Sequence, residues 1–208
     1  MPPADLARRL GEQMFDTPVL GVDPGVAKLG LAVVARERGR PVIVWSRTVQ
    51  TEKATPDAER LHAISEAVRD AISQHGPVSV AIERVAWNVN KASAMAVARA
   101  TGVVMAAAAA AGLEVEEYGS LEVKNAVAGF GNADKAQIRQ ALVRVHGLKD
   151  VPTQPDASDA VAIAVTHLVR SRFNEAVARS DGAGGRSEPV TSLAHTSGGP
   201  RFGGRVAR

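Results

Sequence analysis

Cysteine is absent from this 208-residue sequence, and aromatic residues make up only 3% of it. Without cysteine the chain has no disulfides, no zinc-thiolate centre and no thiol nucleophile, which fits a reducing cytoplasm. Since 45% of the residues are nevertheless hydrophobic, the core must be built from Ala, Val, Leu and Ile. An aromatic side chain near a functional site is therefore conspicuous in this sequence.

No segment approaches the roughly 20 apolar residues of a membrane helix, and the N-terminal residues lack the apolar stretch of a signal peptide. We therefore expect a soluble cytoplasmic protein with no membrane partner. The length is that of one domain. We predict an N-terminal extension over residues 1–17, a folded domain over residues 18–173 and a disordered tail rich in Gly, Ser and Arg over residues 174–208.

The formal net charge of +3 is unevenly distributed. Residues 171–208 hold six arginines against three acidic residues, so the rest of the chain is neutral. A basic tail either keeps a protein soluble or attracts a polyanion weakly, and the sequence favours neither interpretation.

Hydrophobic patterning predicts five strands. Residues 18–23 and 29–49 contain three short runs, the last two joined at Gly39–Pro41, which predicts an antiparallel meander. Residues 78–83 are continuously apolar up to a final acid, as is typical of a strand buried on both faces of a parallel sheet. Residues 113–119 supply a fifth strand.

Helical patterns alternate with the later strands. They cover residues 55–76, 91–111, 121–129, 132–147 and 154–173. Pro56 is predicted at a first helical position, and Ser120 and Asn132 are predicted as N-caps. The fold class is therefore α/β, a mixed five-stranded sheet with three antiparallel strands followed by parallel ones and with helices on both faces.

Two acidic residues stand at the ends of predicted strands. Asp23 closes the apolar run that begins at residue 18, and Glu83 closes the run 78–83. In open α/β sheets this is the edge where ligands bind. A carboxylate near a buried edge is costly unless it is paired or binds a metal ion, so folding alone explains these two acids poorly.

A second pair of acids, Asp156 and Asp159, lies three residues apart in the first turn of the last predicted helix, so both side chains share one helix face. On its own, such a pair is equally well explained by the helix dipole. With Asp23 and Glu83 it completes a set of carboxylates from three remote segments. Oxygen ligands of this kind suit Mg²⁺ or Mn²⁺, and two such ions about 4 Å apart hydrolyse phosphodiester bonds.

Four blocks of the sequence resemble the RuvC family of Holliday junction resolvases, within the RNase H-like superfamily. The blocks are GVDPGVAKLG, AIERV, VKNAVAGFGNADKAQIRQAL and PDASDAVAIAVTH, and the likeness extends over residues 18–170. It implies an RNase H-like nuclease domain and a homodimeric endonuclease that resolves four-way junction DNA by paired symmetric nicks in recombination and repair. It also implies coupling to the branch-migration proteins RuvA and RuvB, and two Mg²⁺ or Mn²⁺ ions held by Asp23, Glu83, Asp156 and Asp159.

Two lysines also match the family pattern. Lys124 and Lys135 occupy positions where resolvases place basic residues near the scissile phosphate. The resemblance implies that they are catalytic, by positioning the phosphate or stabilising transition-state charge. Without the resemblance, either would be an ordinary surface lysine.

The segment after Glu83 departs from the family pattern. Similar resolvases have an aromatic residue three positions after this glutamate, which wedges bases apart, but this chain has Ala86 there and Trp87 next. Trp87 either replaces the wedge by stacking on an unpaired base, or covers the end of the sheet or a dimer contact. The other candidate DNA contacts in this stretch are Arg84, Asn88, Asn90 and Lys91.

Other functions compete with junction resolution. A related RNase H-like family processes structured RNA, although its chains are typically shorter. A noncatalytic junction binder would retain the carboxylates only as caps, and the intact set of four argues against it. DPGVAKLG also resembles the first phosphate loop of actin-like sugar kinases, but this chain is too short for their two domains. The five histidines show no metal-binding pattern, and none is assigned to catalysis.

Overall fold

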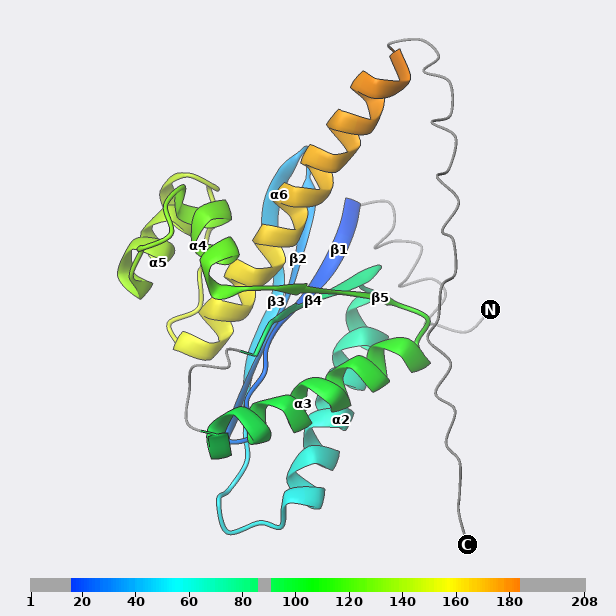
Figure 1. Ribbon diagram of the computed structural model, residues 1–208, viewed down its shortest axis with the longest axis vertical. Coiled ribbons are helices and arrows are strands. Elements are labelled where there is room, and N and C mark those ends of the chain that lie inside the picture. The colour runs from blue at the N-terminus through cyan, green and yellow to red at the C-terminus, as the bar shows by residue number, and fades with distance from the viewer. Residues whose placement is uncertain (1–15, 86–90, 184–208) are drawn as a thin grey trace, which may run out of the picture.

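The computed structural model describes residues 16–85 and 91–183, which form a five-stranded sheet covered by helices (Figure 1). The sheet has the spatial order β3-β2-β1-β4-β5, with strands β1 (Asp16–Asp23), β2 (Lys28–Glu37), β3 (Arg40–Gln50), β4 (Ser79–Glu83) and β5 (Glu114–Tyr118). β2 pairs antiparallel with β1 and β3, whereas β4 pairs parallel with β1 and β5. The predicted fold class is confirmed.

β2 and β3 form a hairpin whose connection is Arg38 and Gly39. Both residues have positive φ angles, 51° and 79°, and Glu37 pairs with Arg40 across the turn. Such a two-residue turn twists in the same sense as the strands that it joins. Arg40 and Pro41, which the sequence places in the connection, therefore already belong to β3.

Helices cover both faces of the sheet. α2 (Asp57–His75) and α3 (Lys91–Ala110) lie on one face, and α4 (Ser120–Ala128), α5 (Lys135–Arg144) and α6 (Pro155–Ala183) lie on the other. Side chains alternate along β1, so Leu20 and Val22 belong to the core under α2 and α3, while Val19 belongs to the core under α6. The sheet thus separates two hydrophobic cores.

The first two helices have nearly the predicted extents. Pro56 is the N-cap of α2 rather than its first residue, and Gly76 ends the helix with a φ of 55°. In α3, the window Ser93–Ala110 has a mean hydropathy of 1.5 and is long and apolar enough to cross a membrane, contrary to the expectation from the sequence. In this fold α3 packs against α2 and β5.

The predicted caps of α4 and α5 are wrong. Gly119 is the N-cap of α4, which begins at Ser120. Asp134, not Asn132, caps α5: its carboxylate accepts from the backbone N–H of Gln137 at 2.8 Å, and the Gln137 side chain accepts from the N–H of Asp134 at 2.9 Å. This reciprocal pair satisfies two N–H groups at once, which Asn132 cannot match.

The first described strand and the last described helix extend past the predicted boundaries. α6 continues to Ala183, beyond residue 173, and takes in the first part of the segment expected to be a disordered tail. β1 begins at Asp16, inside the predicted extension 1–17. The segments 1–15 and 184–208 lie outside the described residues.

Candidate active site

Asp23 and Glu83 leave the sheet side by side. β1 and β4 are parallel neighbours in which Val22 pairs with Ile82, so the next residue of each strand reaches the same edge. Asp23 also pairs with Gly30 of β2. The register of three strands therefore brings these two acids together, as the sequence predicts.

Asp156 and Asp159 reach this edge because α6 lies directly on the sheet. A Cβ atom at Gly30 would overlap the carbonyl oxygen of Asp156, and a Cβ atom at Gly21 would overlap that of Ala160. The helix backbone therefore lies directly against the strands at both glycines, with only the Ala164 methyl group beside it at Gly21. This close approach places the first turn of α6 beside Asp23.

Arg139 of α5 holds the segment that precedes α6. Its guanidinium donates to the carbonyl oxygen of Val151 at 2.7 Å and to that of Pro152. The contact links the start of α6 to α5, whose first residue is Lys135. Arg139 therefore helps to set the position of this lysine relative to the acids of α6.

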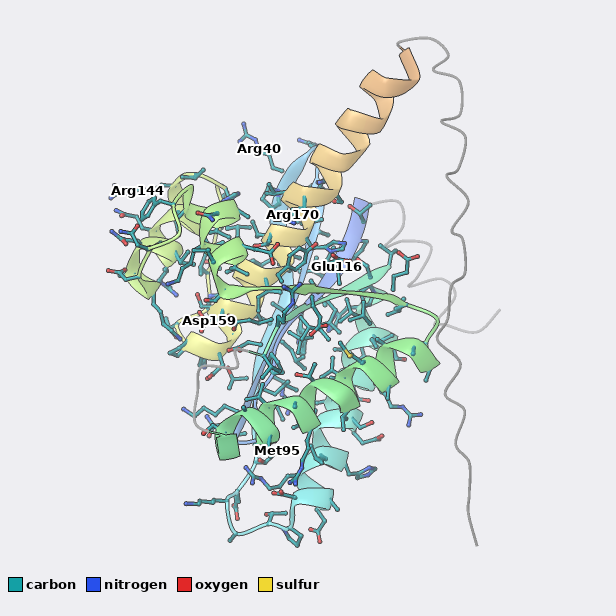
Figure 2. All side chains as sticks on the ribbon, in the orientation of Figure 1. Arg40, Met95, Glu116, Arg144, Asp159 and Arg170 are labelled. Atoms are coloured by element: carbon teal, nitrogen blue, oxygen red, sulfur yellow. The ribbon has the colours of Figure 1, made fainter. Side chains whose placement is uncertain are left out.

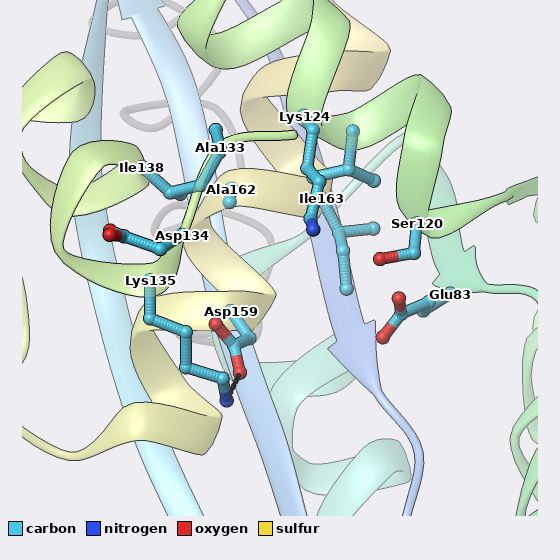
Figure 3. A pocket seen from close by; sticks show the side chains of 11 residues that line it. Glu83, Ser120, Lys124, Ala133, Asp134, Lys135, Ile138, Asp159, Ala162 and Ile163 are labelled. Carbon is cyan, nitrogen blue, oxygen red and sulfur yellow. Dashed lines mark hydrogen bonds and ion pairs between the residues drawn. The ribbon is translucent and has the colours of Figure 1, made fainter. Parts of the chain in front are cut away.

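A cavity of about 430 Å³ opens between the end of β4 and helices α4, α5 and α6 (Figure 3). Its polar lining consists of Glu83, Ser120, Lys124, Asp134, Lys135 and Asp159, and its apolar lining of Val123, Ala133, Ile138, Ala162 and Ile163. Two of the predicted acids and both predicted lysines therefore meet in one cavity.

The other two acids, Asp23 and Asp156, do not line the cavity, but their charges interact with those of the residues that do. The pKa of Asp23 is raised to about 7, chiefly by burial and then by the negative charges of Glu83, Asp159 and Asp156, while the charge of Lys135 opposes the rise. Four carboxylates that repel one another form a site deficient in positive charge, and hard cations relieve such repulsion.

Lys135 supplies part of the positive charge. Its ammonium lies 2.7 Å from Oδ2 of Asp159, the dashed contact in Figure 3, and this hydrogen bond raises the pKa of the lysine. Within residues 16–85 and 91–183, no three His, Asp or Glu side chains stand close enough together to hold a metal ion. Binding of one ion by three or more of these acids therefore requires their side chains to move closer together.

Glu83 has a partner that the sequence reasoning missed. Burial raises the pKa of Glu83, and the nearby Ser120 hydroxyl opposes this rise. Figure 3 shows the two side chains pointing toward one another. Because Gly119 takes the cap position predicted for Ser120, the hydroxyl faces the acid instead. Its place two residues after β5, the strand beside β4, is the signal that relates it to Glu83.

Arg84 is engaged within the protein. Its guanidinium donates to the carbonyl oxygen of Glu117 at 2.9 Å and lies 3.7 Å from Oε2 of Glu122, although more than half of its side chain is exposed. Lys91 is the first residue of α3. The other residues of the predicted wedge and DNA-contact loop lie outside the described part of the chain: Ala86, Trp87, Asn88 and Asn90.

The acidic site lies at the end of β1, the central strand of the sheet, and α6, which packs on β1, completes it. This arrangement defines an RNase H-like nuclease. The family model described as crossover junction endodeoxyribonuclease RuvC matches residues 19–167, a range that contains all four acids and both lysines. The chain belongs to the RuvC family, whose members hydrolyse phosphodiester bonds at crossover junctions.

Individual relatives match nearly their whole length. RuvC of Mycobacterium avium is 43% identical over 164 residues, which cover 78% of this chain and 87% of the relative. RuvC of Corynebacterium jeikeium is 40% identical over 159 residues, covering 76% and 98%. The structure of T. thermophilus RuvC in complex with Holliday junction substrate has a TM-score of 0.71 and 34% identity, covering 76% of this chain and 96% of that one.

Proposed function

We propose that this protein resolves four-way DNA junctions by paired symmetric nicks, made at the cavity beside Glu83 and Asp159. The observation that carries the proposal is the gathering of four carboxylates at one sheet edge, where burial and mutual repulsion raise the pKa of Asp23 to about 7. The substrate is supported by family membership and by the T. thermophilus relative, whose structure contains a Holliday junction substrate.

The donor set fits magnesium or manganese. Carboxylate oxygens are the ligands that these hard ions prefer, and membership of this nuclease family implies dependence on a divalent metal in general. Asp23, Glu83, Asp156 and Asp159 would hold two ions. Bound there, the ions would activate the attacking water and stabilise the departing 3′ oxygen.

The lysines act on the phosphate. Lys124 and Lys135 line the cavity beside Glu83 and Asp159, where the scissile phosphate would lie. With an ion held by the acids, the Lys135 ammonium would be within the cavity that receives the phosphate, where it would stabilise the charge that grows in the transition state. Hydrolysis leaves 5′ phosphates, so the nicked strands can be religated.

Paired nicks require two active sites facing symmetric strands, and a homodimer supplies them. We also propose that this protein is cytoplasmic and that it works with the branch-migration proteins RuvA and RuvB. Contacts with the junction come from the stretch after Glu83, with Trp87 as the base-stacking residue and with Arg84, Asn88, Asn90 and Lys91 as partners of the DNA.

Cleavage of a synthetic four-way junction tests the proposal, with Mg²⁺ or Mn²⁺ and with incision sites mapped on all strands. We expect two nicks at symmetric positions and products that DNA ligase can seal. Faster cleavage of structured RNA would favour an RNA-processing nuclease. Junction binding without nicks in either metal would identify a noncatalytic junction binder.

A further inference from the structure

The first turn of α4 is tied to the elements that carry the acids. The Glu122 carboxylate accepts from the backbone N–H of Gly119 at 2.9 Å, and it lies 3.0 Å from the guanidinium of Arg170 and 3.7 Å from that of Arg84. Arg84 directly follows Glu83, and Arg170 lies on α6, farther along the helix from Asp159 (Figure 2). The trio Arg84, Glu122 and Arg170, here termed the α4 clamp, therefore joins α4 to β4 and α6.

The end of β4 is also fixed from the side of β5. The backbone N–H of Arg84 donates to the carbonyl oxygen of Tyr118 at 2.8 Å, and Tyr118 is the residue paired with Glu83 in the sheet. The Tyr118 hydroxyl lies 3.0 Å from Nδ1 of His167, whose Nε2 lies 3.2 Å from the Ser79 hydroxyl. The main chain at Glu83 is thus held relative to both α4 and α6.

Only the side chain of Glu83 remains to be oriented. It has several rotatable bonds, and fixing them costs conformational entropy. Ser120 and Lys124 stand four residues apart on α4 and both line the cavity, and Figure 3 shows the Ser120 side chain pointing toward Glu83. The α4 clamp ties the turn that carries this hydroxyl to the end of β4 and to α6.

We propose that Ser120 is a positioning residue for the acidic site: its hydroxyl donates to one carboxylate oxygen of Glu83 and holds the other oxygen ready for the metal. Hydrogen bonds to the ligands of a metal orient them and strengthen metal binding. The inference rests on the proposed function, because it assumes that Glu83 binds a metal ion.

Three variants test this role in the full chain. Ser120→Ala removes the hydroxyl, Ser120→Thr keeps it, and Ser73→Ala removes an exposed serine from α2 on the other face of the sheet. Mn²⁺ binding without DNA is measured from the electron paramagnetic resonance signal of free Mn²⁺. Junction cleavage is titrated with Mn²⁺, and junction affinity is measured without metal.

We expect Ser120→Ala to weaken Mn²⁺ binding about tenfold and to raise the Mn²⁺ concentration for half-maximal cleavage by the same factor. The junction affinity measured without metal should stay at the wild-type value. Ser120→Thr and Ser73→Ala should behave as the wild type throughout.

Unchanged Mn²⁺ binding in Ser120→Ala overturns the inference, and so does an equal loss in Ser120→Thr, because the hydroxyl would not be the group that matters. A matching loss of thermal stability in metal-free Ser120→Ala also overturns it, since the serine would then support the fold. Failure of the proposed function looks different: the wild-type protein would leave four-way junctions uncut at every Mn²⁺ concentration.

Discussion

The two halves of the acidic site are held in place by different means. Asp23 and Glu83 end neighbouring strands, and the hydrogen bonds of the sheet fix their spacing. Asp156 and Asp159 belong to α6, whose place depends on contact with Gly21 and Gly30 and on the segment that Arg139 holds. The strand half is therefore set by pairing and the helix half by packing, so the two halves should fail in different ways.

The largest effect is expected in the strand half. Asp23→Asn keeps the size of the side chain but removes a negative charge from the centre of the cluster, so metal-dependent cleavage should fall about a thousandfold. Junction binding without metal should be retained. Single-turnover cleavage and a binding assay in chelator measure the two quantities, and full activity of this variant in magnesium would refute the site assignment.

The helix half can be disrupted by a substitution that leaves all four acids in place. Gly30→Ala places a methyl group against the Asp156 carbonyl, which pushes α6 from the sheet. We expect a loss of about 2 kcal/mol in unfolding free energy and about a hundredfold loss of cleavage. Gly102→Ala on α3 is the control, because a Cβ atom there meets nothing within 4 Å. Similar behaviour of the two variants would show that the close approach of α6 is unimportant.

The electrostatics of Asp23 can be isolated in the metal-free protein. Its pKa is raised in the folded state from 3.8 to about 7, so between these values the folded protein binds more protons than the unfolded chain. The stability due to this group is complete at low pH and is lost as the pH rises through about 7.

Asp23→Asn should therefore stabilise the metal-free protein at pH 8 by about 4 kcal/mol, the free-energy equivalent of the rise in pKa from 3.8 to about 7, which raises the melting temperature by about 10 °C. The gain should be much smaller at pH 5, where the wild-type carboxyl is protonated. Thermal unfolding in chelator at the two pH values measures the difference. Equal gains at both would contradict the raised pKa.

The smallest effect concerns Lys135, the α5 residue that is ion-paired with Asp159 of the helix half. Lys135→Ala frees Asp159 from its ion pair, so Mn²⁺ binding without DNA should tighten by about threefold, while single-turnover cleavage should fall about tenfold through the lost contact with the phosphate. Lys149→Ala, an exposed lysine after α5, serves as the control. Weaker Mn²⁺ binding in Lys135→Ala would show that the lysine supports the metal site instead of competing for it.

The strand half could be predicted from the sequence because continuous apolar runs mark strands, and an acid at the end of such a run marks the sheet edge. The placement of Asp156 and Asp159 could not be derived in the same way. It depends on Gly21 and Gly30, which meet α6 from a remote part of the chain, and no local pattern reveals such a contact. The family resemblance supplied the link that local patterns lack.

The roles of individual polar residues in short segments are even harder to predict from the sequence. Ser120 precedes a helical pattern and was predicted as its cap, but the backbone gives that position to Gly119 and turns the hydroxyl toward Glu83. The N-cap of α5 is Asp134 and not the predicted Asn132, because Asp134 and Gln137 form a reciprocal pair of hydrogen bonds. Such choices between neighbouring polar residues are decided by side-chain reach in three dimensions.

The contact of α6 with Gly21 and Gly30 also has a mechanical meaning. Side chains between a helix and a sheet act as a compliant layer, because they can change rotamer and let the helix slide. Here that layer is nearly absent where the helix carries its acids, because main chain lies against main chain at Gly30, and at Gly21 only the Ala164 methyl group is added. A helix in such direct contact with a sheet cannot slide without a clash of backbone atoms. When a bulky branched substrate binds and exerts force on the surface, Asp156 and Asp159 should therefore keep their positions relative to the sheet.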